Sequence, residues 1–267
     1  MSATKINAYA GSFGCPRRFY NQYIARLKQK ASIYFPIGNI PHKAAEDIVG
    51  KRILNNITNY EDAKIATLNY HDAIWNQRKH EFDQFNISDD ELKTIYVESR
   101  QMMVNWFDVY WAEEPKDPVP FVEQTLWDKE NKLMARIDRA RKGSEPGVFY
   151  IDDYKTGKSN KMWDDTKLQL ICQWLCYKAT TGNTIHMVRA NYLRFREPPK
   201  YWIPTQDQID WALQKVDFVR KNTRSTDIND YPCTCGKCLK DFILENGPSN
   251  QIHTPEPKTE TKSPRSA

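Results

Sequence analysis

Two aspartates and one lysine lie at positions where they could share a metal ion. Asp153 and Lys155 stand at the end of the apolar segment GVFYIDDYK, just before the turn Thr156–Gly157. Because side chains alternate along a β-strand, Asp153 and Lys155 should face the same side. Asp138 lies 15 residues upstream (153 − 138), in KLMARIDRAR, across the turn KGSEPG. We expect these two segments to form an antiparallel hairpin that brings Asp138 beside Asp153.

Two carboxylates held close together repel each other, and this costs stability unless a cation lies between them. Hard divalent cations such as Mg²⁺ take oxygen ligands and keep several waters, which suits metal-assisted hydrolysis of a phosphodiester. An acidic-x-Lys triplet alone decides nothing, because the chain contains eight of them. Without the second aspartate, Asp153 and Lys155 would be read as an ordinary ion pair.

The elements that position these residues follow from the spacing of apolar side chains. We expect residues 1–14 to be irregular and helices to cover 16–30, 40–60, 61–82 and 88–111. Ser88 and Glu91 form a capping box at the start of the last of these. Strands are predicted over 119–127, 132–141, 147–155 and 184–196, and helices over 164–180 and 205–222.

This order predicts an α/β fold in a single domain over residues 1–247. The domain divides into a helical N-terminal region (1–115), an α/β core (116–222) and a cysteine-containing segment (223–247). Residues 248–267 contain four prolines and no aromatic residue, and we expect a disordered tail there.

The charge of the chain is modestly positive, with 39 Lys and Arg against 34 Asp and Glu. Residues 1–30 hold six basic side chains and no acidic one, with aromatic residues among them. They suit phosphate and base contacts, or simply form a solvated basic helix with core aromatics. No apolar run is long enough to span a bilayer and no signal-peptide core is present, so no membrane association and a cytoplasmic location are expected.

Five motifs, taken in order, resemble the RecB-type branch of the PD-(D/E)XK nucleases. They are SFGCPRRF, GNIPHKAAE, MARIDRA, YIDDYKTGK and KLQLICQWLCY, and they run from about residue 12 to 240. The resemblance implies a restriction-endonuclease-like core, with a mixed central sheet flanked by helices. It also implies a DNA nuclease that depends on Mg²⁺ or Mn²⁺.

The resemblance assigns a role to each matching residue. Asp138 and Asp153 would bind the metal, and Lys155 would orient or deprotonate the attacking water. His42 matches an upstream helical histidine that adds an imidazole ligand and shifts preference toward Mn²⁺; without the resemblance it is an ordinary helical histidine. Gln169 would position Lys155 or the substrate.

Several further residues have less definite expectations. A shifted match would replace Gln169 by Gln173 with Tyr177, and we also expect Tyr177 to contact DNA. Arg17 and Arg18 would line a channel for a single strand. For the acids Glu46 and Glu123, a salt bridge or an exposed charge is expected. These acids, glutamines and basic residues are therefore secondary candidates for the site.

The six cysteines fall into two sets. Cys172 and Cys176 are one helical turn apart among apolar residues and should be buried. Cys15, Cys233, Cys235 and Cys238 resemble the iron–sulfur staple of AddB-type and CRISPR-associated RecB-type exonucleases, which implies a [4Fe–4S] cluster. The spacing C-x-C-x₂-C is tighter than the usual arrangement, so Zn²⁺ is the alternative, and a site without metal is a third reading.

The expected function is therefore that of an exonuclease acting on DNA ends or single strands. It would serve recombination, repair or the processing of foreign DNA in a bacterial, archaeal or phage-infected host cell, with a helicase or recombinase as partner. The alternatives are a structure-specific endonuclease of the same fold, a non-catalytic DNA-binding subunit, and a metal-cluster scaffold protein. The intact set of Asp138, Asp153 and Lys155 argues against the non-catalytic subunit, whereas in a scaffold protein these acids would be fortuitous.

Overall fold

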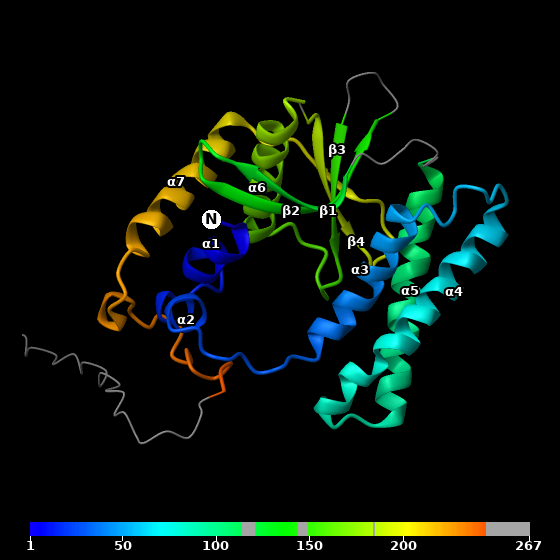
Figure 1. The fold of residues 1–267 in the computed structure, drawn as a ribbon, viewed down its shortest axis with the longest axis horizontal. Helices are drawn as coiled ribbons and strands as arrows, with labels where there is room; N and C mark the ends of the chain where they lie inside the picture. The colour runs from blue at the N-terminus through cyan, green and yellow to red at the C-terminus, as the bar shows by residue number, and fades with distance from the viewer. Residues whose placement is uncertain (114–120, 144–148, 184, 244–267) are drawn as a thin grey trace, which may run out of the picture.

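A computed structural model of the chain describes residues 1–113, 121–143, 149–183 and 185–243. Its centre is a five-stranded sheet in the order β1-β2-β3-β4-β5 (Figure 1). The strands are β1 (Phe121–Asp128), β2 (Leu133–Lys142), β3 (Phe149–Lys155), β4 (Met187–Tyr192) and β5 (Lys200–Trp202). Only β3 and β4 pair in parallel; the other neighbours are antiparallel. The predicted hairpin and the mixed sheet are thus confirmed.

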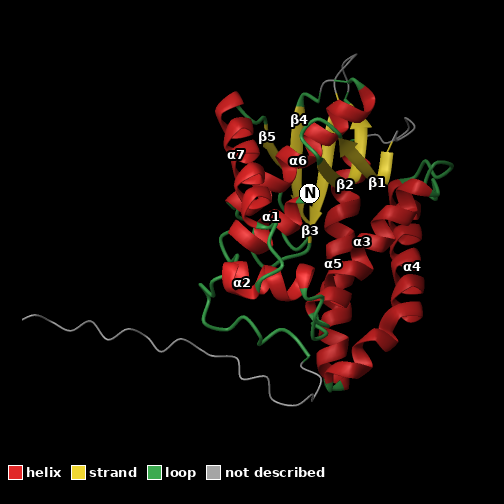
Figure 2. Ribbon diagram, turned by 60° about the vertical axis from the view of Figure 1, so that its left-hand side comes forward, coloured by secondary structure: helices red, strands yellow, loops and turns green. Residues whose placement is uncertain are grey.

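The helices form two groups around the sheet: α1 (Ala3–Ala10), α6 (Asp164–Thr181) and α7 (Gln206–Asn222) pack together, and α3 (Tyr34–Gly50), α4 (Tyr60–Arg78) and α5 (Asp89–Ala112) pack together (Figure 2). Helix α6 covers β1 and β2, with α1 and α7 beside it, and α3 reaches β1. A short helix α2 (Pro16–Phe19) and a π-helical turn (Tyr20–Ile24) precede α3, and 3₁₀ turns cover Lys79–Phe85 and Ile228–Asp230.

Each group of helices has its own apolar core, and the sheet lies between the two cores. One core joins α1, α6 and α7 to the sheet, and the other joins α3, α4 and α5. Tyr154 and Leu193 belong to the second core although they come from the sheet side of the chain. Asn105 Nδ2 in α5 also donates to the backbone oxygen of Leu193 over 2.8 Å. The helical part is therefore tied to the end of β3 and β4, next to Lys155.

A buried ion network fixes the far end of α5 to the sheet. Arg189 in β4 pairs with both Asp152 in β3 and Glu113 after α5. Arg139 and Arg141 in β2 approach the same two acids. Burial would raise the pKa of Asp152, but the charges of Arg189, Arg139 and Arg141 and the hydrogen bond from Arg189 together outweigh it and hold that pKa below its usual value. Because strand residues alternate, this network lies on the opposite face of β3 from Asp153.

Some predicted boundaries were wrong for identifiable reasons. Residues 3–10 form a helix, where we expected irregular chain, because Ser2 caps it and Ile6 and Tyr9 bury in the first core. Helix α3 begins at Tyr34, earlier than predicted, and it ends at Gly50, so residues 51–59 lie in turns and loop rather than in the predicted helix. Strand β4 covers six of the thirteen residues predicted, and β5 was missed.

One further expectation is confirmed, and others lie outside the residues that the structure describes. The capping box of Ser88 and Glu91 is present at the start of α5. Most of the turn KGSEPG and the expected disordered tail lie outside the described residues. Among the helices that are described, none is long and apolar enough to cross a membrane.

Candidate metal centre and active site

Three acids lie in one row across the first three strands. The pairs Arg139–Asp152 on β2–β3 and Val122–Arg139 on β1–β2 set the register. Moving each pair by one residue, the register sets Asp138 opposite Asp153 on β3 and opposite Glu123 on β1. Directly opposite residues of antiparallel strands share a face of the sheet. The aspartates expected to meet across the hairpin therefore do so, and Glu123 joins them from the other side.

The central aspartate is held in a low-dielectric, negatively charged environment. Asp138 is 9% exposed and Asp153 is 1% exposed. The backbone N–H of Tyr154 donates to Asp138 Oδ2 over 2.6 Å. Burial and then the nearby charge of Asp153 raise the pKa of Asp138. A pair of acids in this state gains stability from a bound cation, which restores the favourable charged form of both.

Lys155 and Gln169 hold the second aspartate on its other side. Lys155 Nζ lies 2.7 Å from Asp153 Oδ2, so the two side chains share a face as strand alternation predicted. Gln169 in α6 accepts from Lys155 Nζ over 2.7 Å and donates to Asp153 Oδ1 over 2.7 Å. Gln173, one helical turn later, donates to the same oxygen over 3.1 Å. The structure thus brings Gln169 to Lys155, and it adds Gln173 rather than exchanging the two.

The close approach of α3 to the end of β3 requires glycine at position 38. A Cβ atom on Gly38 would lie 2.7 Å from Thr156 Oγ1, in the turn after Lys155. No side chain fits at that distance without displacing the threonine. The missing side chain lets α3 lie against this turn, and one helical turn later it presents His42 to the acids.

His42 bridges two of the three acids. Its Nε2 lies 2.5 Å from Glu123 Oε1 and 3.5 Å from Asp138 Oδ1. One donor atom from each of these three residues lies within 4.8 Å of the others. Burial would lower the pKa of His42, but hydrogen bonds to Asp138 and Glu123 outweigh it and raise it to about 10. At neutral pH the imidazole of His42 is therefore protonated, and its charge offsets that of the acids.

Glu123 is the residue of this site that the sequence reasoning underrated. We expected a salt bridge or an exposed charge, and Glu123 does pair with Arg136, but its side chain is only 9% exposed. Its backbone φ is 51°, in the left-handed region that side chains other than glycine seldom adopt. Such strain concentrates at functional sites. Counting the register back from Asp138 across β1 would have found Glu123.

The oxygen and nitrogen atoms of this site suit a divalent cation as ligands. Carboxylate oxygens suit Mg²⁺ and Mn²⁺, and an imidazole nitrogen favours Mn²⁺. Among the residues that the structure describes, the cations paired with these acids are His42, Lys155 and Arg136. A divalent ion would supply the same positive charge with oxygen and nitrogen ligands already gathered.

Of the residues expected to contact DNA, Arg17 and Arg18 lie beside the C-terminal segment and Tyr177 lies in the first core. Arg17 donates through Nε to the backbone oxygen of Tyr231 over 2.7 Å, and Arg18 pairs with Asp241. Tyr177 is fully buried in the first core, so the expectation that it contacts DNA has to be corrected. Glu46 forms the expected salt bridge, with Lys43, at 3.0 Å.

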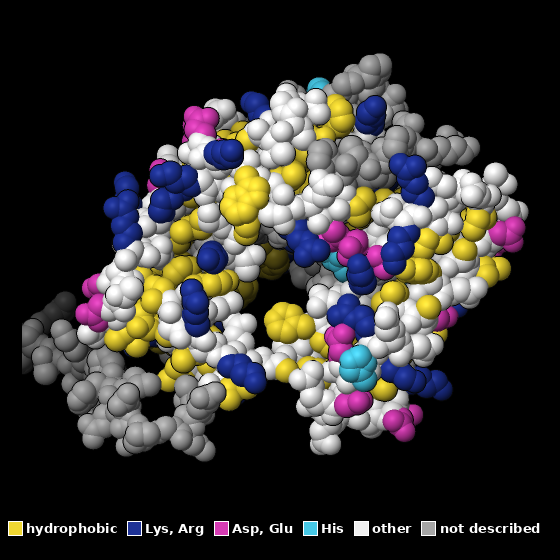
Figure 3. All heavy atoms as spheres, viewed as in Figure 1, with side chains coloured by type: hydrophobic (Ala, Val, Ile, Leu, Met, Phe, Trp, Pro, Cys, Tyr) yellow, Lys and Arg dark blue, Asp and Glu magenta, His cyan; other side chains and the backbone are white. Residues whose placement is uncertain are grey.

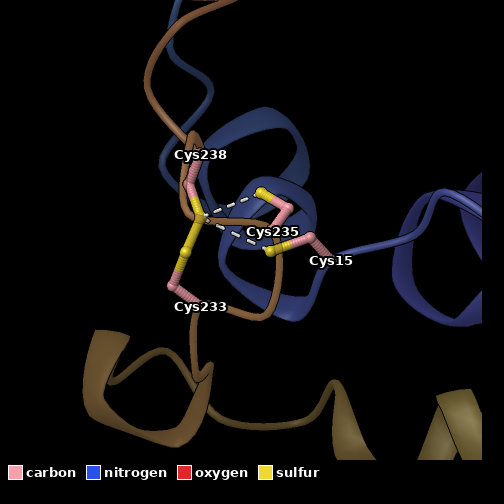
Figure 4. A group of neighbouring side chains, drawn as sticks. All are labelled: Cys15, Cys233, Cys235 and Cys238. Atoms are coloured by element: carbon pink, nitrogen blue, oxygen red, sulfur yellow. Dashed lines mark hydrogen bonds between the residues drawn. A yellow bond between two sulfur atoms is a disulfide. The ribbon is translucent and has the colours of Figure 1, made fainter. Parts of the chain in front are cut away.

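The four cysteines outside the core gather as expected (Figure 4). Their sulfurs all lie within 4.8 Å of one another, with Cys15 and Cys235 at 3.4 and 3.5 Å from Cys238. Cys233 and Cys238 are joined by a disulfide. Burial would raise the pKa of Cys15, but N–H groups of Thr234 and Arg18 outweigh it and lower it to about 7. Cys172 and Cys176 are buried, as predicted.

Comparisons with known proteins agree with this geometry. The model of the PD-(D/E)XK nuclease superfamily matches residues 1–240 of the chain. Among solved structures, the fold is similar to that of a protein from Eubacterium rectale described as a "putative exonuclease", with a TM-score of 0.50 and 12% identity. That match covers 93% of this chain and 90% of the other, and at this identity it shows a shared fold alone. No curated protein matches the chain.

Proposed function

Because the chain belongs to the PD-(D/E)XK nuclease superfamily, whose members are metal-dependent nucleases, we propose that it is a DNA exonuclease. It would hydrolyse phosphodiester bonds at DNA ends or in single strands with Mg²⁺ or Mn²⁺. The observation that carries the proposal is the row of Glu123, Asp138 and Asp153 with Lys155 beside it. Its place in the RecB-type branch rests on the five sequence motifs.

One set of side chains would bind the metal, and another would act at the attacking water. His42, Asp138 and Asp153 would hold the metal. A divalent ion bound there supplies Lewis acidity to the phosphate and lowers the pKa of a bound water. Lys155 Nζ, held by Asp153 and Gln169, stands where it can donate a hydrogen bond to the attacking water or to the phosphate. Gln169 fixes that ammonium and is a positioning residue.

The shape of the molecule supports action on a single strand. Figure 3 shows an opening between the part with α1, α6 and α7 and the part with α3, α4 and α5. In Figure 1 the chain crosses from one part to the other below this opening, through residues 25–33. The backbone N–H of Lys30 donates to the oxygen of Asp241 over 2.8 Å, which secures this crossing to the C-terminal segment. An enclosed passage favours strands that enter by a free end.

The test is digestion of end-labelled and circular single-stranded DNA with Mn²⁺ or Mg²⁺. The native chain is expected to shorten linear strands and leave circles intact, while Asp153→Asn and Lys155→Ala lose cleavage. Cleavage of circles at the same rate would indicate the endonuclease alternative. Cleavage that both substitutions leave unchanged would reject the site.

For the cysteine group we propose a structural metal bound by Cys15, Cys233, Cys235 and Cys238 as thiolates, with the Cys233–Cys238 disulfide reduced in the metal-bound protein. A [4Fe–4S] cluster is what the motifs imply, and a zinc ion is the alternative. With Zn–S bonds of about 2.3 Å, tetrahedral ligand sulfurs lie roughly 3.8 Å apart. The contacts of 3.4 and 3.5 Å favour the single ion. Metal analysis after anaerobic purification separates iron from zinc, and a chain with neither rejects this part of the proposal.

A further inference from the structure

A basic hollow opens between α3, α4 and the 3₁₀ turn that follows α4. Its volume is about 650 Å³, which falls within the roughly 300–1,000 Å³ typical of ligand sites. Three of its lining residues carry a permanent positive charge, Lys43, Lys51 and Arg78, and His80 adds an imidazole. Only Asp47 among the lining residues is acidic. The hollow is therefore suited to an anionic ligand.

The single acid lies beneath the lysines rather than in front of them. The side chain of Asp47 is 8% exposed, whereas those of Lys43 and Lys51 are 40% and 59% exposed. Both ammonium groups lie 3.0 Å from Asp47, one on each carboxylate oxygen. Tyr70 donates to Asp47 over 3.1 Å and accepts from Lys51 over 2.9 Å. Asp47 thus fixes the lysines at the floor while their charges face the hollow.

Donors remain for a ligand on each cation. A lysine ammonium has three N–H donors, and Lys43 and Lys51 each use two in the contacts described. Arg78 donates two of its five N–H groups to Glu81. His80 is exposed and donates through Nδ1 to the backbone oxygen of Gln77, which leaves Nε2 toward solvent. These contacts hold the side chains in place, and each side chain keeps hydrogen-bonding capacity for a ligand.

The hollow begins next to the metal centre. Lys43 directly follows His42 in α3, and Lys51 is the residue that follows the end of this helix, about 12 Å further along its axis. Figure 3 shows Lys and Arg side chains gathered over α3 and α4, beside the acidic and histidine side chains at the edge of the opening. A residue of the metal centre and a cation of the hollow therefore lie side by side in the sequence of one helix.

We propose that this α3–α4 hollow binds phosphate groups of the nucleic-acid strand that reaches the metal centre. The inference rests on the proposed nuclease function and adds a second contact point for its substrate. Each phosphate that Lys or Arg neutralises releases a condensed counterion, so the contact has a measurable dependence on salt. The ring of Tyr70 and the apolar Ile74 also line the hollow and offer a surface for a sugar or base.

The test measures binding without cleavage. In an Asp153→Asn background without added divalent metal, the affinity for a fluorescein-labelled single-stranded oligonucleotide is measured by anisotropy over a series of salt concentrations. Lys51→Gln with Arg78→Gln is compared with Lys221→Gln and Arg224→Gln, which remove the same charge at the end of α7, on the opposite side of the molecule (Figure 1). Thermal unfolding confirms that both double variants are folded.

The hollow pair is expected to lower affinity by about 10-fold and to reduce the slope of log K against log salt by about 1.4, the value for two lost single-strand contacts. The α7 pair should change neither. Equal losses in both pairs, or no loss in the hollow pair, would overturn the inference. Displacement of the strand by inorganic phosphate at the same concentration of phosphate groups would show a site for the free anion instead. Cleavage by the native chain is assayed separately, so failure of the nuclease proposal is recognised independently.

Discussion

Glu123 lies opposite Asp138 across β1 and β2, and His42 Nε2 contacts both carboxylates, at 2.5 and 3.5 Å. The residue adopts a left-handed φ of 51° at this point of the strand. Burial would raise the pKa of Glu123, but the hydrogen bonds and charges of His42 and Arg136 together outweigh it and hold the pKa below its usual value. Glu123 is therefore strained, ionised and nearly buried, and it lies beside the expected metal ligands His42 and Asp138. Its carboxylate is placed to act as a third ligand.

Glu123→Gln is therefore expected to weaken Mn²⁺ binding by at least about 10-fold. The amide keeps the size of the side chain and removes the charge. Isothermal calorimetry with MnCl₂ measures the affinity. The matched control is Glu46→Gln, which removes an acid one turn after His42 that pairs with Lys43. Equal affinities of the two variants would exclude Glu123 as a ligand.

Gln169 is expected to act through Lys155 rather than on the substrate. Gln169→Ala removes the contacts to Lys155 Nζ and Asp153 Oδ1, both at 2.7 Å. We expect kcat to fall by about 10–100-fold with little change in KM, since the lysine is displaced but the strand still binds. Steady-state cleavage of a labelled strand measures both constants. The Gln169→Glu variant should also cleave more slowly than the native chain, because a carboxylate cannot donate to Asp153. A fall confined to KM would assign Gln169 to substrate binding.

The cysteine group is expected to stabilise the chain by joining its two ends. Cys15 and Cys238 are separated by 223 residues, and their sulfurs lie 3.4 Å apart. Under reducing conditions Cys15→Ser should lose on the order of 2–5 kcal/mol of stability, the range for removing a cross-link from a small domain. It should also lose the response of the melting temperature to a metal chelator, because binding free energy is folding free energy at such sites.

Cys176→Ser is the control for lost packing, since Cys176 is a buried thiol outside the group. It should lower the melting temperature and keep the response to the chelator. If the native chain melts at the same temperature with and without chelator, the cysteines hold no stabilising metal.

The extent to which the sequence predicted this site depends on how local each signal is. Asp153 and Lys155 follow from the alternation of one strand, and Asp138 from a hairpin with a short turn. Gln169 came from the motif in α6. Glu123 needed the register of a third strand, which an isolated glutamate in a short segment does not reveal. The burial of Tyr177 depends on tertiary packing in the first core, and the helix at residues 3–10 combines the local cap of Ser2 with that same packing.

Buried His71 gives the native state a pH dependence that is separate from catalysis. His71 is fully buried in α4, where Nε2 lies 2.8 Å from Ser99 Oγ and Nδ1 lies 3.1 Å from Asp72. Burial lowers the pKa of His71 below its ordinary value of 6.5 despite the neighbouring carboxylate. The unfolded chain therefore takes up this proton at a higher pH than the folded chain does.

The sign of the effect follows from that difference. Stability from neutral His71 is complete above the unfolded pKa of 6.5 and is lost as the pH falls toward the lowered folded pKa, by up to about 1.4 kcal/mol per pH unit. His42, whose pKa is raised to about 10, loses its contribution as the pH rises from 6.5 toward that value. The two histidines therefore act in separate windows, and the acid-side window belongs to His71.

Denaturant unfolding of the native chain, His71→Gln and His186→Gln between neutral and mildly acidic pH tests this assignment. His71→Gln should lower stability at neutral pH by removing a buried side chain that fits its site, and the difference from the native chain should shrink as the pH falls. His186 is exposed, so His186→Gln should parallel the native chain throughout. A constant difference between His71→Gln and the native chain at every pH would mean that His71 does not titrate on unfolding.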